Sequence, residues 1–214
     1  MLLSSAYFPP VEYFALLARD FRPVPGGGTV PSEVRVEACE NFSKQTWRSR
    51  CNILTSTGVE TLRVPVVHSP DMLMSKVRIE YSTPWVVRTE RAIDSAYGSA
   101  AFYEYYRDGI FGILSSGEET LFGLNMRITR FFLEKTGISC NLVPTKVYTP
   151  AGQVGDDWRE AVHPKRPNTI LRDLELEKPY YQVFSGKYGF VSGLSIMDLL
   201  FNEGPDSISF LKRL

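Results

Sequence analysis

The sequence predicts an α/β fold in a single domain spanning residues 1–214, with a mixed, partly antiparallel sheet and several packed helices. Two observations support this fold class. Short apolar or alternating runs, typical of strands, occur between longer segments whose apolar residues recur at helical spacing. The 214 residues also lie within the size of one compact domain, and no internal repeat divides them.

The chain opens with an expected strand, turn and helix. Residues 2–8 form a short apolar run that Pro9 and Pro10 end, and residues 11–19 carry apolar side chains at helical spacing. A loop of prolines and glycines follows at residues 23–28. It lacks the G-x-G-x-x-G and G-K-S/T patterns of phosphate-binding loops, so we interpret it as a turn.

Three further strands are expected in the first half of the chain. In residues 33–37, Val34 and Val36 share one side and charged residues share the other, as in a half-exposed strand. Residues 62–66 and 77–81 show similar alternation, and Pro65 indicates an edge or a bulge. The short connection between these two strands predicts an antiparallel pair.

The middle of the chain is predicted to be helical. One helix begins after Pro84, and a second covers residues 102–114. A third carries an apolar stripe from Leu121 to Phe132 and ends near Gly137, a natural C-terminal stop.

The last third of the chain mixes strands, an arm and helices. Strands are expected at residues 142–148 and 180–184, and the polar, proline-containing stretch 150–179 between them is expected to form a lid or arm. A helix then starts at Ser195, with Asp198 at capping-box spacing, and a last short helix follows it.

Composition argues against several classes of protein. Lys plus Arg equals Asp plus Glu at 24 each, so no net charge attracts the chain to nucleic acid or to an anionic membrane. No apolar segment is long enough to span a bilayer, and the first residues lack the pattern of a signal peptide. The three cysteines show no C-x-x-C pairing, which indicates reduced thiols in a cytoplasmic protein. We therefore expect no nucleic-acid partner, no membrane span and no metal site; the sequence identifies no cofactor and leaves the oligomeric state open.

A segment with two arginines is the first candidate for ligand binding. In an extended segment, Arg48, Arg50 and Asn52 share one face. Alternate residues of a strand lie about 6–7 Å apart, which suits a diphosphate, or a phosphate and a carboxylate. The alternative is a solvated polar face whose arginines pair with Glu37 or Glu40.

Two residues are candidate general bases. His68 extends one face of the strand predicted at residues 62–66, and Glu12 follows the first strand, at the edge where open α/β sheets often bind ligands. Each has a structural alternative: a core or rim histidine for His68, and a solvated helix-start carboxylate for Glu12.

Four further residues are candidates for substrate binding. Asn125 interrupts the apolar stripe of the third middle helix, and a buried amide must find partners, which a ligand or a loop can supply. His163 and Lys165 lie in the polar arm, where they either close over an anion or belong to solvated surface. Tyr7, in the turn between the first strand and helix, completes this set.

An ordered set of sequence blocks resembles the WbqC-like family and spans most of the chain. The blocks are Tyr7-Phe8-Pro9-Pro10-Val11-Glu12-Tyr13-Phe14, the run from Glu40 to Cys51, Leu62-Arg63-Val64-Pro65-Val66, Trp85 with its helix, Phe102-Tyr103-Glu104-Tyr105, and the tail from Tyr181 through Leu194 to Pro205. The run around Lys44, Gln45 and Arg50 and the tail carry most of the weight. One position differs, because the family often has a histidine four residues after the tryptophan and this chain has Thr89.

The resemblance implies work on sugars or sugar nucleotides in the biosynthesis of bacterial O-antigen and other polysaccharides. Our first hypothesis is a transferase acting on an activated, phosphate-bearing or nucleotide-linked sugar. Arg48 and Arg50 would hold the anion, with His68 or Glu12 as the base. The second hypothesis is a non-catalytic binding or scaffold protein of a polysaccharide assembly system.

Overall fold

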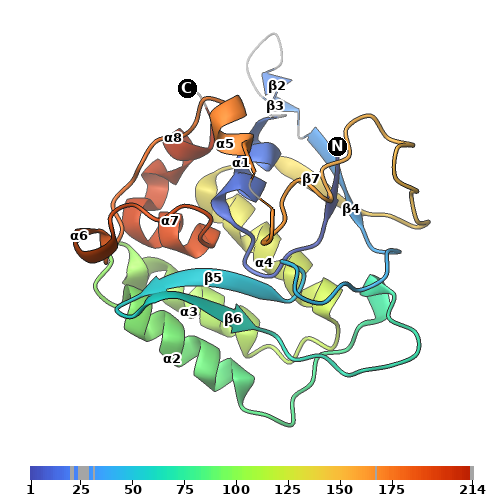
Figure 1. Cartoon of the computed structure of the whole chain (residues 1–214), viewed down its shortest axis with the longest axis horizontal. Helices are drawn as coiled ribbons and strands as arrows, with labels where there is room; N and C mark the ends of the chain where they lie inside the picture. The colour runs from blue at the N-terminus through green and yellow to red at the C-terminus, as the bar shows by residue number, and fades with distance from the viewer. Residues whose placement is uncertain (20–21, 24–28, 31, 167, 213–214) are drawn as a thin grey trace.

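Three parallel strands form the central sheet of the computed structural model, which describes residues 1–19, 22–23, 29–30, 32–166 and 168–212. They are β1 (Leu2–Ser4), β4 (Ser32–Glu37) and β7 (Cys140–Pro144), with β4 in the middle (Figure 1). Parallel sheets are normally covered on both faces. Val34 and Val36 of β4 are accordingly buried, and Glu37 at its end is fully buried as well.

Helix α1 (Val11–Arg19) follows β1 after a sharp turn. Phe8 in this turn has a φ of 40°, which is unusual for a bulky residue, and its ring lies 6.1 Å from that of Phe132. Phe14 of α1 contacts the same ring at 6.0 Å. These aromatic contacts dock α1 on α4 (Leu121–Thr136), and the turn thereby fixes the position of Glu12 at the start of α1.

Three helices follow one another in the middle of the chain: α2 (Trp85–Tyr97), α3 (Tyr103–Leu114) and α4. Local signals at both ends define α4. Thr120 accepts a hydrogen bond from the N–H of Gly123 at 3.1 Å, and Gly137, with a φ of 71°, ends the helix in the left-handed conformation. All three helices were predicted, and the structure confirms them.

An antiparallel hairpin lies beside the central sheet and packs on α2 (Figure 1). Its strands are β5 (Arg50–Thr55) and β6 (Gly58–Arg63), and Gly58 has a φ of 113° after the two-residue connection. Cys51 and Ile53 of β5 are buried. The alternate residues of the same strand therefore lie on the opposite, more polar face.

Shorter elements complete the described fold. They are β2 (Arg22–Pro23), β3 (Thr29–Val30), η1 (Met74–Lys76), α5 (Ile170–Asp173), α6 (Ser185–Tyr188), α7 (Ile196–Glu203), η2 (Gly204–Ser207) and α8 (Ile208–Leu211). Most of the loop predicted at residues 23–28 lies outside the described residues. No helix of the described residues has the length and apolar character needed to cross a bilayer.

Two predicted features of the strands are wrong in detail. The segment 180–184 forms no strand, because the side chains of Tyr180 and Gln182 are used in hydrogen bonds to Asp198. The predicted pair of strands at residues 62–66 and 77–81 shrinks to one antiparallel bridge between Val66 and Ile79. Leu62 belongs to β6, which pairs with β5 instead. The alternation pattern did not reveal this hairpin.

The start of α7 also differs from the predicted capping box. Ser195 caps the helix as expected, and its Oγ accepts a hydrogen bond from the N–H of Met197 at 3.2 Å. The Asp198 carboxylate turns into the protein instead, where it accepts hydrogen bonds from Tyr180 and Gln182, each at 2.8 Å. Burial raises the pKa of Asp198 to about 6.

The start of the polar arm is anchored to the central sheet by one arginine. Arg159 donates to Glu37 at 3.2 Å, to the Thr149 carbonyl oxygen at 2.7 Å and to Asp157 at 2.5 Å. These bonds raise the pKa of Arg159 and lower that of Asp157. The arm is therefore an ordered part of the fold at this point.

Candidate functional site

An open cleft of about 700 Å³ lies where the ends of the hairpin meet the start of α2. We call it the basic cleft, because four of its lining residues are cationic: Lys44, Arg50, Arg63 and Arg88. Glu60 is the acidic residue among those that line it. The chain as a whole has no net charge, so this concentration of positive charge is local and favours anionic ligands.

Two guanidinium groups in the cleft belong to directly opposed residues. Arg50 starts β5 and pairs in register with Arg63, which ends β6. Like charges directly opposite one another on a sheet are destabilising, and a bound anion would remove this repulsion. Burial, followed by the charge of Arg63, lowers the pKa of Arg50. The pair is suited to hold a phosphate or a diphosphate between its two forks.

The cations of the basic cleft are unpaired within the described part of the chain. Among the described residues, Lys44, Arg50, Arg63 and Arg88 form no ion pair, although ion pairs are common elsewhere on the surface. The Nε of Arg50 is buried and lacks a hydrogen-bond partner within the described protein. Buried polar groups usually find partners, so this N–H would gain one from a ligand that reaches it.

The floor of the cleft is built by the first turn of α2. Trp85 and Thr89 line the cleft, and the buried indole Nε1 of Trp85 has no partner in the described part of the chain. Tyr7 lies one layer deeper, fully buried near Thr89, and burial raises the pKa of its hydroxyl group. Tyr7 therefore supports the floor and does not itself line the cleft.

The rim carries two further polar groups. His68 is exposed and lines the cleft together with Gln45. Gln45 has a φ of 61°, a conformation that non-glycine residues adopt rarely and mostly at constrained positions. Lys165 of the polar arm donates a hydrogen bond to the side chain of Gln45, so the arm reaches the edge of the cleft.

The expected pair of Arg48 and Arg50 does not form. Arg48 precedes β5 and is buried, where its Nε and Nη2 donate to the two carboxylate oxygens of Glu40 at 2.8 and 2.6 Å. The alternative interpretation, in which the arginine pairs with Glu40, is therefore the one that the structure shows for Arg48. The extended backbone starts at Arg50, so the alternation that would align both arginines does not reach Arg48.

The other candidates also have structural partners. Asn125 is fully buried and donates to the Arg48 carbonyl oxygen at 2.8 Å, which ties the segment before β5 to α4. Asn52 accepts a hydrogen bond from Thr61 at 2.9 Å across the hairpin. His163 accepts one from the N–H of Lys165 at 3.1 Å, and burial lowers its pKa. None of Asn52, Asn125 and His163 lines the basic cleft.

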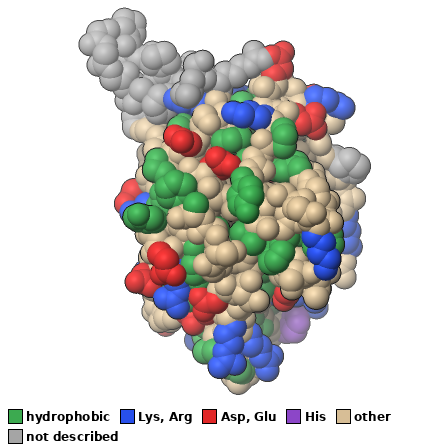
Figure 2. All heavy atoms as spheres, turned by 90° about the vertical axis from the view of Figure 1, so that its left-hand side faces the viewer, with side chains coloured by type: hydrophobic (Ala, Val, Ile, Leu, Met, Phe, Trp, Pro, Cys, Tyr) green, Lys and Arg blue, Asp and Glu red, His purple; other side chains and the backbone are tan. Residues whose placement is uncertain are grey.

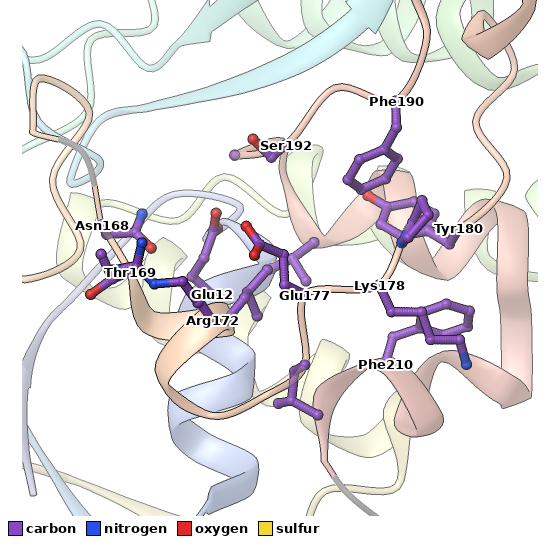
Figure 3. Close-up of a pocket in the computed structure, with 15 residues that line it drawn as sticks. Glu12, Asn168, Thr169, Arg172, Glu177, Lys178, Tyr180, Phe190, Ser192 and Phe210 are labelled. Carbon is purple, nitrogen blue, oxygen red and sulfur yellow. The ribbon is translucent and has the colours of Figure 1, made fainter.

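Glu12 lines a different cavity, which we call the Glu12 pocket (Figure 3). This pocket lies between the start of α1, the α5 segment and the stretch that precedes α7, and it shares no lining residue with the basic cleft. Glu12 is only 4% exposed. The structure therefore brings Arg50 and His68 together but separates them from Glu12.

Burial raises the pKa of Glu12 above its ordinary value of 4.5, although the neighbouring Asn168 amide partly offsets this effect. A carboxyl group whose pKa is raised on folding destabilises the folded state once it ionises. The free energy of unfolding should therefore fall as the pH rises through the interval above 4.5. We expect Glu12→Gln to raise the melting temperature by about 2–4 °C at about pH 7 and to leave it nearly unchanged at about pH 4.

The measurement is thermal unfolding by circular dichroism at both pH values. Glu104→Gln, which changes an exposed carboxylate on α3, is the matched control and should show no such difference. A Glu12→Gln protein that melts below the wild type near pH 7 would contradict the expectation.

The fold and the site together define an α/β protein with an open, cationic cleft on an antiparallel hairpin. The model of the WbqC-like protein family matches residues 5–163, so the chain belongs to this family. It is also 25% identical, over 237 aligned positions, to the uncharacterized protein Rv1507c of Mycobacterium tuberculosis (strain ATCC 25618 / H37Rv), covering 99% of this chain and 96% of that protein. No solved structure matches the chain.

The match to the family covers the basic cleft completely. All of the residues that line the cleft lie between Phe42 and Thr89, inside the matched stretch. The Glu12 pocket is built largely by residues beyond position 163. The basic cleft, unlike the Glu12 pocket, thus lies wholly within the family match, and it also carries a local concentration of positive charge.

Sequence reasoning missed Lys44, Arg63 and Arg88 as members of the site. For Arg63 a signal was present, since a hairpin turn at residues 56–57, before Gly58, sets the register that places Arg63 opposite Arg50. Arg88 gave no such signal, because its position depends on how α2 packs against the hairpin.

Proposed function

We propose that the protein is a transferase that binds an activated, phosphate-bearing or nucleotide-linked sugar in the basic cleft, as a step in the biosynthesis of a cell-surface polysaccharide. The observation that supports this most is the opposed pair Arg50 and Arg63, which forms no ion pair in the described protein. A phosphate or diphosphate group accepts hydrogen bonds from two guanidinium forks at once and neutralises both.

Roles for the other cleft residues follow from their positions. Trp85 offers its unpartnered indole N–H to a hydroxyl or phosphate oxygen, and its ring provides an apolar surface for a sugar or a base. His68 is the candidate base, because imidazole side chains commonly act as general bases and this one lies at the rim beside the cations. It would accept the proton of an acceptor hydroxyl as that oxygen forms its bond to the sugar and the nucleoside diphosphate leaves with the electron pair of the broken bond.

A ligand titration tests the proposal. We expect UDP-glucose, used as a probe, to bind the wild type and to raise its melting temperature, because a ligand at a hundredfold excess over its Kd adds about 2.7 kcal/mol to stability. Arg50→Met should weaken this binding about tenfold to a hundredfold, the usual effect of removing a hydrogen bond to a charged group. Isothermal titration calorimetry measures the affinity directly.

Arg130→Met is the matched control, since Arg130 is exposed on α4 outside the basic cleft and its loss changes the net charge equally. This variant should bind UDP-glucose like the wild type. Glucose, which carries no phosphate, should not bind measurably to the wild type or to Arg130→Met. Equal affinities of the Arg50→Met and wild-type proteins for UDP-glucose, or no binding of any sugar nucleotide to the wild type, would overturn the proposal.

A non-catalytic binding or scaffold role is the second candidate, and exposed aromatic residues favour it. Tyr105 of α3 is 80% exposed and Tyr181 is 62% exposed. On the face shown in Figure 2, however, hydrophobic side chains are interspersed with charged ones. Incubating the wild type and His68→Ala with UDP-glucose and a mixture of acceptors separates the candidates: product formed only by the wild type supports the transferase, and tight binding without product supports the scaffold.

A further inference from the structure

The Glu12 pocket has the features of a second binding site. It is a cavity of about 370 Å³, within the size range of small-molecule sites, and it is more enclosed than the basic cleft. Four parts of the chain form its walls: the start of α1, the α5 segment with the following loop to Tyr180, the residues from Phe190 to Gly193, and Phe210 of α8 (Figure 3). The polar side chains that point into the cavity decide which ligand it can bind.

The carboxyl group of Glu12 does point inward. The residue is 4% exposed, and its Oε2 atom is buried and has no hydrogen-bond partner among the described residues. Figure 3 shows the side chain rising from α1 into the cavity. A buried carboxyl oxygen without a partner is costly, so this position favours a ligand that donates a hydrogen bond to it.

A second carboxyl group lies at the mouth of the same cavity. Glu177 is exposed, and Figure 3 shows its carboxyl group turned toward the part of the pocket that Glu12 enters. Two cationic side chains line the pocket but are directed elsewhere: Lys178 places its Nζ 4.2 Å from the centre of the Phe210 ring, and Arg172 pairs with Asp173 at 3.7 Å. Among the described residues, neither Glu12 nor Glu177 has a cationic partner.

The remaining wall is aromatic and fixed in place. The Tyr180 ring packs edge-on against Phe190 at 5.1 Å and against Phe210 at 5.7 Å. The hydroxyl group of Tyr180 donates to the buried carboxylate of Asp198 at 2.8 Å, which holds the ring at the side of the pocket. Aromatic faces attract cations and the C–H groups of ring-shaped ligands.

We propose that the Glu12 pocket binds a small molecule that carries a primary ammonium group on a ring-sized body. The ammonium group donates to Glu12 and faces Glu177, and the body packs against Tyr180, Phe190 and Phe210. A metal ion is a poorer match, since no group of three or more potential ligands gathers anywhere in the described chain. This site is independent of the proposed function, because it shares no residue with the basic cleft.

Benzylamine tests the proposal against benzyl alcohol, which has the same ring and shape without the charge. By calorimetry or ligand-observed NMR at about pH 7, we expect the wild type to bind benzylamine roughly tenfold or more tightly than benzyl alcohol. Glu12→Gln, which keeps the size of the side chain, should remove this preference. Arg50→Met should preserve it, so failure at this site and failure at the basic cleft can be told apart.

Crystals of the wild type soaked with benzylamine provide a measurement that does not depend on a variant folding. The expected result is density for the ring beside Tyr180, with the nitrogen within hydrogen-bond distance of a Glu12 carboxyl oxygen. The proposal is overturned if the wild type binds benzyl alcohol as tightly as benzylamine, if Glu12→Gln retains the preference, or if the soaked pocket shows no density.

Discussion

Arg48→Met is expected to lower the free energy of unfolding by about 3–5 kcal/mol, the usual cost of removing one partner of a buried ion pair. Arg48 is 6% exposed and Glu40 is 8% exposed. Their bidentate contact, at 2.6 and 2.8 Å, is supplemented by a hydrogen bond from Arg48 to Ser4 at 2.8 Å. Without the guanidinium group, Glu40 would keep its charge in a buried site with Ser4 as its remaining donor.

Urea denaturation measures this effect. The double variant Arg48→Met, Glu40→Leu should recover most of the loss, because it removes both buried charges together. A loss of less than about 1 kcal/mol in the single variant would show that the pair behaves as an exposed one. The result also matters for ligand studies, since weaker binding by an Arg48 variant would report unfolding and not a lost ligand contact.

Arg159→Met is expected to have the second largest effect, a loss of about 3 kcal/mol together with release of the start of the polar arm. Arg159 bridges the fully buried Glu37 of the central strand and the Thr149 carbonyl oxygen of the arm. Its removal leaves Glu37 with hydrogen bonds from neutral donors such as Thr145 at 2.5 Å. The segment around residues 149–159 then loses its ionic link to the sheet.

Limited proteolysis, read out by mass spectrometry, should show new cleavage between residues 145 and 166 in Arg159→Met. Arg166→Met is the matched control, because Arg166 lies in the same arm but forms an exposed pair with Glu160, with side chains 61% and 65% exposed. Cleavage patterns that are the same in the wild type and Arg159→Met would mean that the arm is held by other contacts.

The helices of this fold could be predicted because their signals are local. In α4 the apolar stripe, the Thr120 cap and the Gly137 stop all lie within the helix or next to it. The segment 180–184 shows the opposite case. A strand was expected there, but Tyr180 and Gln182 bond to Asp198, which is distant in sequence, and this contact overrides the local preference.

The candidate site was predictable only in part, for a related reason. The alternation of arginines identified Arg50, but the partner of Arg50 depends on where the strand begins and which strand lies opposite. Because β5 starts at Arg50, Arg48 turns into the core, and the register of the hairpin supplies Arg63 instead. Glu12 was predicted as a candidate base at the end of the first strand, yet the packing of the chain's last third places it in its own pocket, apart from the basic cleft.

A crystal structure of the wild type soaked with UDP-glucose would show whether the basic cleft holds a sugar nucleotide. We expect density for the diphosphate between the guanidinium groups of Arg50 and Arg63, with an oxygen within hydrogen-bond distance of the Arg50 Nε. A basic cleft without density at saturating UDP-glucose, or with the ligand bound away from both arginines, would contradict it.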